Sequence, residues 1–329
     1  MKEIKFGYHR LRVRFFAHAD LSLEGWIGAV LRNNFLVQAA AVKDKMDISL
    51  FEYLNCFPLP KTHPAYKALQ GGFQKALWFD FREIPVNNRS HILRANQIYV
   101  LAIVMVDSFL IHFPMVAEAL RRMFNRGFGH PVVPATLVDI SDCDAEDHWR
   151  LCYQPDTGVV HMSMHAIHLS DFQLADRAPS AATVQIDFNT PVNLFRQRAK
   201  KDSEQSFQDK LNGFPSFYQL VRSLAYRVST LDLLYGDPIG EGGWSETEIE
   251  TSVRIACEAQ LLQVNLRNCK VRGTPKQGNS HVYVMEGYQG RLILQQVPSI
   301  CLPLLAFGMG LLVGNQVQYG LGAYTLTLL

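Results

Sequence analysis

The C-terminal stretch LPLLAFGMGLLVGNQVQYGLGAYTLTLL, residues 302–329, is the part of the sequence that indicates the fold most directly. Its apolar beginning, Pro303 to Val313, has the pattern of a helix, and its last residues alternate as in a short strand. Between them, Gly314, Gly320 and Gly322 punctuate a loop. Glycine adopts positive φ and lets another backbone come close, so this loop suits either a sharp turn or a seat for the phosphates of a nucleic acid. The spacing alone leaves both interpretations open.

The first half of the chain predicts the order strand, helix, strand, strand, helix, strand. Alternation of polar and apolar residues marks the strands, and apolar residues at helical spacing mark the helices. Asp20 or Ser22 can cap the first helix, and Pro114 suits the start of the second. The predicted strands are 9–18, 76–84, 97–109 and 131–140. The first predicted helix has its apolar positions at Trp26, Ala29, Val30, Phe35 and Leu36, and the second is about 114–124. This order is that of a ferredoxin-like domain, an antiparallel sheet backed by two helices.

The second half predicts a modified copy of the same domain. The acidic stretch 141–148 is interpreted as a linker, so we place the domains at residues 1–143 and 144–329. Gly287 and Gly290 between two strand-like pieces indicate a hairpin. The predicted elements are strands at 149–154, 158–170, 182–190, 281–286 and 291–296 and helices at 215–235 and 245–263, followed by the final helix, loop and strand. The expected fold class is α+β, with two tandem ferredoxin-like domains whose antiparallel sheets face a central basic cleft.

Composition supports a folded protein of this size. With 329 residues, of which 48% are hydrophobic, the chain can bury the cores of two domains. The six cysteines are scattered without a Cys-x-x-Cys pair, which argues against a zinc ribbon and a disulfide framework. No segment has the length of a signal peptide core or a membrane span, so we expect a cytoplasmic location.

Basic residues are clustered although the net charge is only +2. Each cluster alone is typical of a solvated surface, but three together favour a polyanionic partner. The clusters are Arg121, Arg122 and Arg126; Arg196, Arg198, Lys200 and Lys201; and Arg267, Lys270, Arg272 and Lys276.

The segment 313–324, Val-Gly-Asn-Gln-Val-Gln-Tyr-Gly-Leu-Gly-Ala-Tyr, resembles the C-terminal glycine-rich loop of the CRISPR-associated precursor-RNA processing endoribonucleases of the RAMP superfamily. Other motifs of that family follow one another in the same order over nearly the whole chain. They are the glycine-centred segment ending in Leu-Arg at 23–32, the passage 97–140 with Gly127 and Gly129, the strand ending in Thr-Pro at 184–191, the helix 217–236, Arg272 and the segment 287–290.

The resemblance implies an endoribonuclease that cuts precursor CRISPR RNA within its repeats, without a metal or other cofactor. The ribose 2′-hydroxyl would attack the phosphate, leaving a 2′,3′-cyclic phosphate and a 5′-hydroxyl. A histidine suits the base or the acid of this reaction because it titrates near neutrality. The candidates are His63 and Tyr66, in the loop segment KTHPAYK, and His18 at the end of the first strand.

RNA binding is assigned to the glycine loop and to basic side chains, since backbone amides and cations both hold phosphates. Of Arg222 and Arg227, which lie on different faces of one helix, we expect at most one to face the RNA. The candidate RNA-binding residues are Arg196, Arg198, Arg222, Arg227, Arg272, Lys276, Gly314, Asn315, Gln316, Gly320 and Gly322.

Departures from the family pattern keep a second interpretation open. Relatives often carry a histidine in or just after the first helix, and residues 21–41 contain none. They also often carry basic residues in the closing loop, where this chain has Asn315-Gln316 and Ala323. The alternatives are a repeat-binding subunit of a CRISPR effector complex that does not cut, or an RNA-processing domain of a fusion with a reverse transcriptase and an integrase. The expected partners are repeat RNA and other CRISPR-associated proteins, and dimers in the family leave a homodimer open.

Overall fold

The computed structural model describes residues 3–70, 74–84, 90–129, 131–162, 164–172, 180–194, 216–272 and 284–329. Within these ranges, no helix combines the length and the apolar character that crossing a membrane requires. The chain forms two compact units. The first comprises Gly7–Ile167 and Lys270–Met285, and the second comprises Met1–Phe6, His168–Cys269 and Glu286–Leu329.

The first unit is built on a six-stranded sheet with the order β3-β5-β1-β6-β7-β8. Its elements are β1 (Tyr8–Ala17), β2 (Leu21–Glu24), α1 (Ile27–Ala41), α2 (Leu50–Asn55), α3 (Tyr66–Gln70), β3 (Leu77–Asp80), β4 (Ser90–Leu93), β5 (Ile98–Val106), η1 (Asp107–His112), α4 (Phe113–Arg126), β6 (Ala135–Cys143), β7 (Trp149–Gln154) and β8 (Val159–Val160). β1 pairs antiparallel with both β5 and β6, and β2 and β4 form a separate ribbon.

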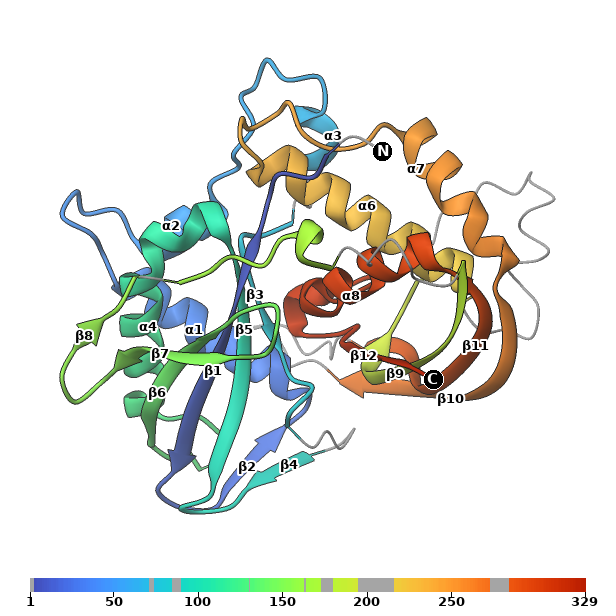
Figure 1. Ribbon diagram of the computed structural model, residues 1–329. Helices are drawn as coiled ribbons and strands as arrows, with labels where there is room; N and C mark the ends of the chain where they lie inside the picture. The colour runs from blue at the N-terminus through green and yellow to red at the C-terminus, as the bar shows by residue number, and fades with distance from the viewer. Residues whose placement is uncertain are drawn as a thin grey trace. The chain divides into compact units, whose positions relative to one another are not determined.

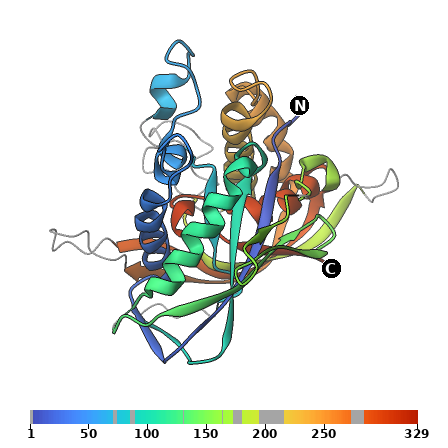
Figure 2. The ribbon, with the colours of Figure 1, turned by 90° about the vertical axis from the view of Figure 1, so that its left-hand side faces the viewer.

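Helices α1 and α4 lie side by side and cover one face of this sheet (Figures 1 and 2). Leu11, Val13 and Phe15 of β1 are fully buried, whereas the residues between them are only half-buried. This alternation places every second residue of the strand on the helix side. Phe15 stacks on Phe124 of α4 at 4.5 Å between ring centroids, which joins the sheet to its helix layer.

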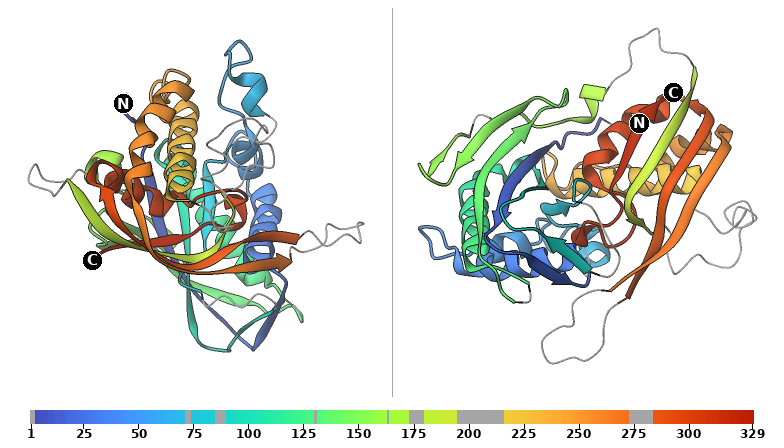
Figure 3. Two further views of the ribbon diagram at one scale, coloured as in Figure 1. Left: turned by 90° about the vertical axis from the view of Figure 1, so that its right-hand side faces the viewer. Right: turned by 90° about the horizontal axis from the view of Figure 1, so that it is seen from below.

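The second unit repeats the topology with a four-stranded sheet in the order β10-β11-β9-β12. Its elements are η2 (Leu169–Phe172), β9 (Ala181–Val192), α6 (Phe217–Tyr235), α7 (Glu246–Val253), η4 (Arg254–Glu258), β10 (Gln260–Arg272), β11 (Val284–Pro298), η5 (Ser299–Cys301), α8 (Leu302–Leu311), η6 (Val317–Tyr319) and β12 (Tyr324–Leu328). Figure 3 shows α6 and α8 on one face of this sheet. β9 pairs antiparallel with β11 and with β12.

Both sheets contain the strand order of the ferredoxin-like fold, in which the first and third strands are central and the second and fourth are at the edges. The first unit presents β6-β1-β5-β3, and the second presents β12-β9-β11-β10. The predicted fold class, two tandem ferredoxin-like α+β domains, is confirmed.

The expected boundary after residue 143 falls inside the first sheet. The acidic stretch that follows is a short connection, because β7 returns and pairs antiparallel with β6, and β8 pairs with β7. The strands at 149–154 and 159–160 therefore belong to the first unit, which extends to Ile167.

Two predicted elements of the second unit are wrong. The helix expected to reach residue 263 ends much earlier, and Gln260 begins an edge strand. The hairpin expected at 287–290 is one continuous strand, β11. A side chain at Gly287 would meet the Val192 carbonyl oxygen at 2.7 Å, and one at Gly290 would meet the Asn265 carbonyl. These glycines mark close backbone approach between neighbouring strands and not a turn.

Candidate nucleic-acid interface

Backbone hydrogen bonds join the two ends of the glycine loop between α8 and β12, and others join the loop to the end of β9. Val313 N donates to Gly322 O at 2.9 Å, and Gly322 N donates to Pro191 O at 3.0 Å. Asn315 N donates to Asn193 O at 2.9 Å. The loop is therefore a defined structure that the end of β9 positions.

Glycine suits the backbone at all three positions, and at Gly314 and Gly322 there is no room for a side chain. All have positive φ, namely 89° at Gly314, 73° at Gly320 and 83° at Gly322. A Cβ atom at Gly314 would lie 2.5 Å from the Asn193 carbonyl oxygen, and one at Gly322 would overlap the Val313 carbonyl oxygen. The turn interpretation of the spacing is thus correct, and it does not exclude a phosphate seat.

The part of the loop around η6 offers polar groups to solvent. Asn315 and Gln318 are exposed. Among the described residues, no backbone carbonyl accepts from the amides of Val317 or Gln318, which form the first turn of η6. Backbone amides that have no acceptor are donors that an anion can use.

Thr190 explains why a Thr-Pro sequence ends the central strand of the second sheet. Its side chain is fully buried, and its Oγ1 accepts a hydrogen bond from Ala323 N at 2.8 Å. The Ala323 carbonyl in turn accepts from Asn189 N at 2.9 Å. The hydroxyl therefore holds the end of the glycine loop against β9 where β12 begins.

Arg227 does not face solvent. It is 6% exposed, and its Nε donates to the Leu311 carbonyl at the end of α8 at 2.7 Å. Burial lowers the pKa of Arg227 to about 9, against a smaller opposing contribution from Tyr235. Its assignment as an RNA contact is corrected: it secures the end of α8, from which the glycine loop starts.

Arg222 also makes contacts within the second unit. Its Nε donates to Glu250 Oε1 at 2.6 Å, and its guanidinium lies 4.8 Å from the ring centre of Tyr226. It therefore ties α6 to α7. That at most one of the two arginines of α6 faces the RNA stays a prediction.

Lys270 and Arg272 are exposed and alternate with the buried Cys269 and Val271, so they share one face of β10. The Arg272 carbonyl accepts from Trp26 N at 2.7 Å, which anchors the end of the strand beside the start of α1. Three of the predicted RNA-binding residues, Arg196, Arg198 and Lys276, lie outside the described residues.

His63 lies between α2 and α3, and Tyr66 is the first residue of α3; local contacts hold this segment. His63 Nδ1 accepts from Ala65 N at 3.1 Å. The ring centres of Tyr66 and Phe57 are 5.1 Å apart. Because Nδ1 is an acceptor, the neutral imidazole carries its proton on Nε2. His63 is thus arranged to donate from Nε2.

His18 lies at the end of β1 and is exposed. Its Nε2 lies 2.9 Å from the Thr136 hydroxyl. The hydroxyl can donate or accept in this bond, so either nitrogen of His18 can serve as the basic one. The structure thus gives the two histidines different proton arrangements.

Lys75 and Arg32 are two neighbouring cations that sequence reasoning missed. Lys75 Nζ donates to Asn55 Oδ1 at 3.0 Å. Burial lowers the pKa of Lys75, and the charge of Arg32 lowers it further. Arg32 ends the Leu-Arg motif of the first helix, which was the signal available in the sequence; nothing in the sequence singles out Lys75.

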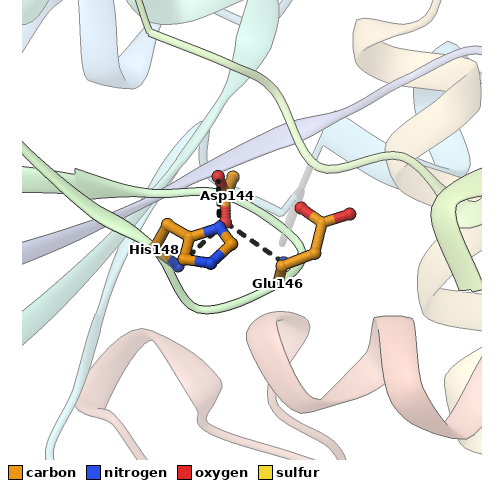
Figure 4. Close-up of side chains that lie close together, drawn as sticks. All are labelled: Asp144, Glu146 and His148. Atoms are coloured by element: carbon orange, nitrogen blue, oxygen red, sulfur yellow. Dashed lines mark hydrogen bonds and ion pairs between the residues drawn. The ribbon is translucent and has the colours of Figure 1, made fainter.

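One group of potential metal ligands occurs among the described residues: Asp144, Glu146 and His148 (Figure 4). Asp144 Oδ1 accepts from the backbone amides of Glu146 at 3.1 Å and His148 at 2.9 Å. These hydrogen bonds lower the pKa of Asp144, and the bond from His148 N contributes most. The carboxylate shapes the β6–β7 turn, and we assign no metal to it.

Known proteins match the chain in the region that builds this loop. The family model described as CRISPR-associated endoribonuclease Cas6 matches residues 186–324, the stretch from the middle of β9 to the start of β12. No curated protein sequence matches the chain.

Solved structures match over nearly the whole chain. A Cas6 product complex has a TM-score of 0.51 at 12% identity, covering 98% of this chain and 99% of that one. Thermus thermophilus Cas6 has a TM-score of 0.50 at 12% identity, with coverage of 98% and 99%. A partial Cas6-RT-Cas1–Cas2 complex has a TM-score of 0.53 at 14% identity, covering 99% of this chain and 46% of that one.

At these identities the structural matches show a shared fold. The family match covers the glycine loop, Thr190, α6 and both central strands of the second sheet, so it rests on the elements that build the candidate interface. The resemblance inferred from the sequence is thereby confirmed over residues 186–324, which match the family model described as CRISPR-associated endoribonuclease Cas6.

Proposed function

We propose that the protein is an endoribonuclease that cuts precursor CRISPR RNA within its repeats and needs no metal ion. The observation that carries the proposal is the Cas6 family match to residues 186–324, which contain a fully formed glycine loop. Phosphates of the repeat would accept hydrogen bonds from the amides of Val317 and Gln318, and Lys270 and Arg272 would supply charge.

The proposed reaction is an internal transesterification. The 2′-oxygen loses its proton to a base and attacks the adjacent phosphorus, and the bond from phosphorus to the 5′-oxygen breaks. The leaving oxygen takes a proton from an acid. The products are a 2′,3′-cyclic phosphate and a 5′-hydroxyl, with no net consumption of water.

His18 is the better candidate for the base, and His63 is the better candidate for the acid, because His63 Nδ1 already accepts from Ala65 N. Tyr66, next to His63 in the same segment, is a second proton donor. Lys75 with Arg32 would stabilise the charge that develops on the phosphorane oxygens. Burial and the charge of Arg32 lower the pKa of Lys75, which makes its ammonium group a better proton donor than that of an ordinary lysine.

Two alternatives have specific observations behind them. A repeat-binding subunit that does not cut is favoured by the absence of histidine from residues 21–41. A role beside a reverse transcriptase and an integrase is favoured by the match to the Cas6-RT-Cas1–Cas2 complex, of which this chain spans less than half.

Single-turnover cleavage of a labelled repeat RNA by His18→Ala, His63→Ala and Tyr66→Phe separates these functions. We expect the two histidine variants to cut at least about 100-fold more slowly, the usual contribution of a general acid or base, with unchanged RNA affinity. Wild-type protein that binds the repeat tightly but leaves it uncut would establish the binding-subunit alternative instead.

A further inference from the structure

Strands β7 and β8 extend the first sheet beyond the ferredoxin-like order and bring an aromatic side chain beside the arginine-rich strand β1. Residues directly opposite one another in an antiparallel sheet share a face. The opposed sets across β1, β6 and β7 are Arg10, Cys143 and Trp149, and Arg12, Ser141 and Leu151. Arg10, Arg12, Trp149 and Leu151 therefore lie on one face, opposite to the face that α1 and α4 cover.

Trp149 lies against both arginines. The Arg12 guanidinium carbon lies 4.5 Å from the ring centre and that of Arg10 lies 5.4 Å away. Both distances are within the range of cation–π attraction. The stack fixes the orientation of two flexible side chains, so they are arranged in advance of any ligand.

Arg12 differs from its neighbours on β1 in its ion-pair partners. Arg10 is paired with Glu83 and Asp147, and Arg14 is paired with Asp139. Among the residues that the structure describes, no carboxylate pairs with Arg12, and its buried Nε donates to no acceptor. In the described part of the chain, Arg12 thus contacts the Trp149 ring instead of forming an ion pair.

We infer that Arg12 and Trp149 form a nucleotide subsite for single-stranded RNA. A base would stack against the Arg12–Trp149 pair with Leu151, which is 48% exposed, at its edge. The adjoining phosphate would accept from Arg12. RNA-binding domains with ferredoxin-like sheets use aromatic side chains on the face away from the helices in this way. The inference rests on the proposed function and adds a contact outside the family-matched region.

The test is RNA affinity as a function of salt, measured by fluorescence anisotropy with a labelled repeat RNA that carries spacer sequence at both ends. Arg12→Gln should weaken binding about tenfold and reduce the slope of log Kd against log salt by about 0.7, the value for one phosphate contact to a single strand. Trp149→Leu should weaken binding about five- to tenfold by loss of stacking, with an unchanged slope. The two variants thus report separately on charge and on stacking.

Arg150→Gln is the matched control. Arg150 is also on β7, but it lies opposite Asp142 on the other face, and its side chain is 56% exposed. It should bind with the wild-type Kd and slope. Thermal unfolding of each variant verifies that it is folded, and crosslinking of 4-thiouridine RNA to the peptide containing Trp149 supports the site independently of any substitution.

Equal Kd and slope for Arg12→Gln, Arg150→Gln and wild type would overturn the inference and leave a protein partner as the ligand of this face. Absence of a crosslink in β7 under conditions where wild-type protein cuts the repeat would overturn it as well. In both cases the proposed function stands if wild-type protein cuts the same RNA in a parallel cleavage assay. Failure of wild-type protein to bind the RNA would overturn both.

Discussion

At the scale of single residues, Gly322 is the position where the glycine loop tolerates least change. Its φ is 83°, and a Cβ there would overlap the Val313 carbonyl oxygen. Gly158, in the turn before β8, has a similar φ of 64°, but a Cβ there would have no heavy atom within 4 Å. Comparing a substitution at Gly158 with one at Gly322 therefore separates the cost of backbone strain from the cost of steric overlap.

We predict that Gly158→Ala costs about 1–2 kcal/mol, the left-handed strain alone. Gly322→Ala should cost more, because the neighbouring backbone must also move, and it should weaken repeat binding. Thermal unfolding and RNA affinity of the two variants measure this. An equal loss of Tm in both variants would show that the close approach of the Val313 carbonyl adds no cost to the substitution of Gly322.

His9 is a buried titratable residue between two carboxylates. Its Nε2 lies 2.9 Å from Asp107 Oδ1, and its Nδ1 lies 3.6 Å from Asp142 Oδ1. Burial lowers the pKa of His9, but hydrogen bonding and the charges of Asp142 and Asp107 together outweigh it, so the pKa lies above 6.5. At 3.6 Å, the contribution of Asp142 is mainly its charge.

A folded-state pKa above the unfolded value means that protonation of His9 stabilises the native protein. This stabilisation is fully present below pH 6.5 and is lost as the pH rises through the folded-state pKa. The Tm difference between wild type and His9→Gln should therefore shrink as the pH is raised from about 6 to about 9. A difference that grows over this interval would contradict the assignment of a protonated His9.

At the scale of elements, α7 is held on α6 by a cluster of hydrogen bonds around Glu250. Tyr218 donates to Glu250 Oε2 at 2.6 Å, and Arg222 donates to Oε1 at 2.6 Å. Tyr226 donates to Glu246 at 3.0 Å, and burial, with these carboxylates, raises the pKa of Tyr226 to about 12. Both phenols thus remain protonated donors at neutral pH.

We predict that Arg222→Met lowers stability by about 1 kcal/mol, a typical value for a partly exposed ion pair, and leaves RNA affinity and its salt slope unchanged. Thermal unfolding and anisotropy titrations measure the two effects. A reduced salt slope would restore Arg222 as an RNA contact.

The sequence predicted most elements because their patterns are local. The alternation in β1 and the proline at the start of α4 are properties of neighbouring residues. Strand β10 was missed because most of its side chains are exposed, so it lacks the apolar alternation that marks a half-buried strand. Gly290 was taken for a turn because the sequence does not show that Asn265 of the neighbouring strand passes next to it.

The candidate site divides in the same way. The glycine loop could be predicted, since positive φ at three positions favours glycine in the sequence itself. The burial of Arg227 and the stack of Arg12 on Trp149 could not, because each depends on residues distant in the chain. Contacts of that kind are set by packing and leave no local pattern.

At the scale of the whole molecule, the chain carries the ferredoxin-like strand order twice. The second copy holds the Cas6 family match, and the first holds the candidate catalytic residues His18, His63 and Tyr66. We therefore expect cleavage to require both units, whereas the second supplies the glycine loop for binding.

The most direct test is cleavage of the repeat RNA in excess EDTA, compared with the same RNA carrying a single 2′-deoxy substitution at the cut site. We predict cleavage of the ribose substrate with a 2′,3′-cyclic phosphate end, and no cleavage of the substituted RNA, because the attacking oxygen is missing. Cleavage of the deoxy substrate, or loss of all cleavage in EDTA that Mg²⁺ restores, would contradict the proposed metal-independent mechanism.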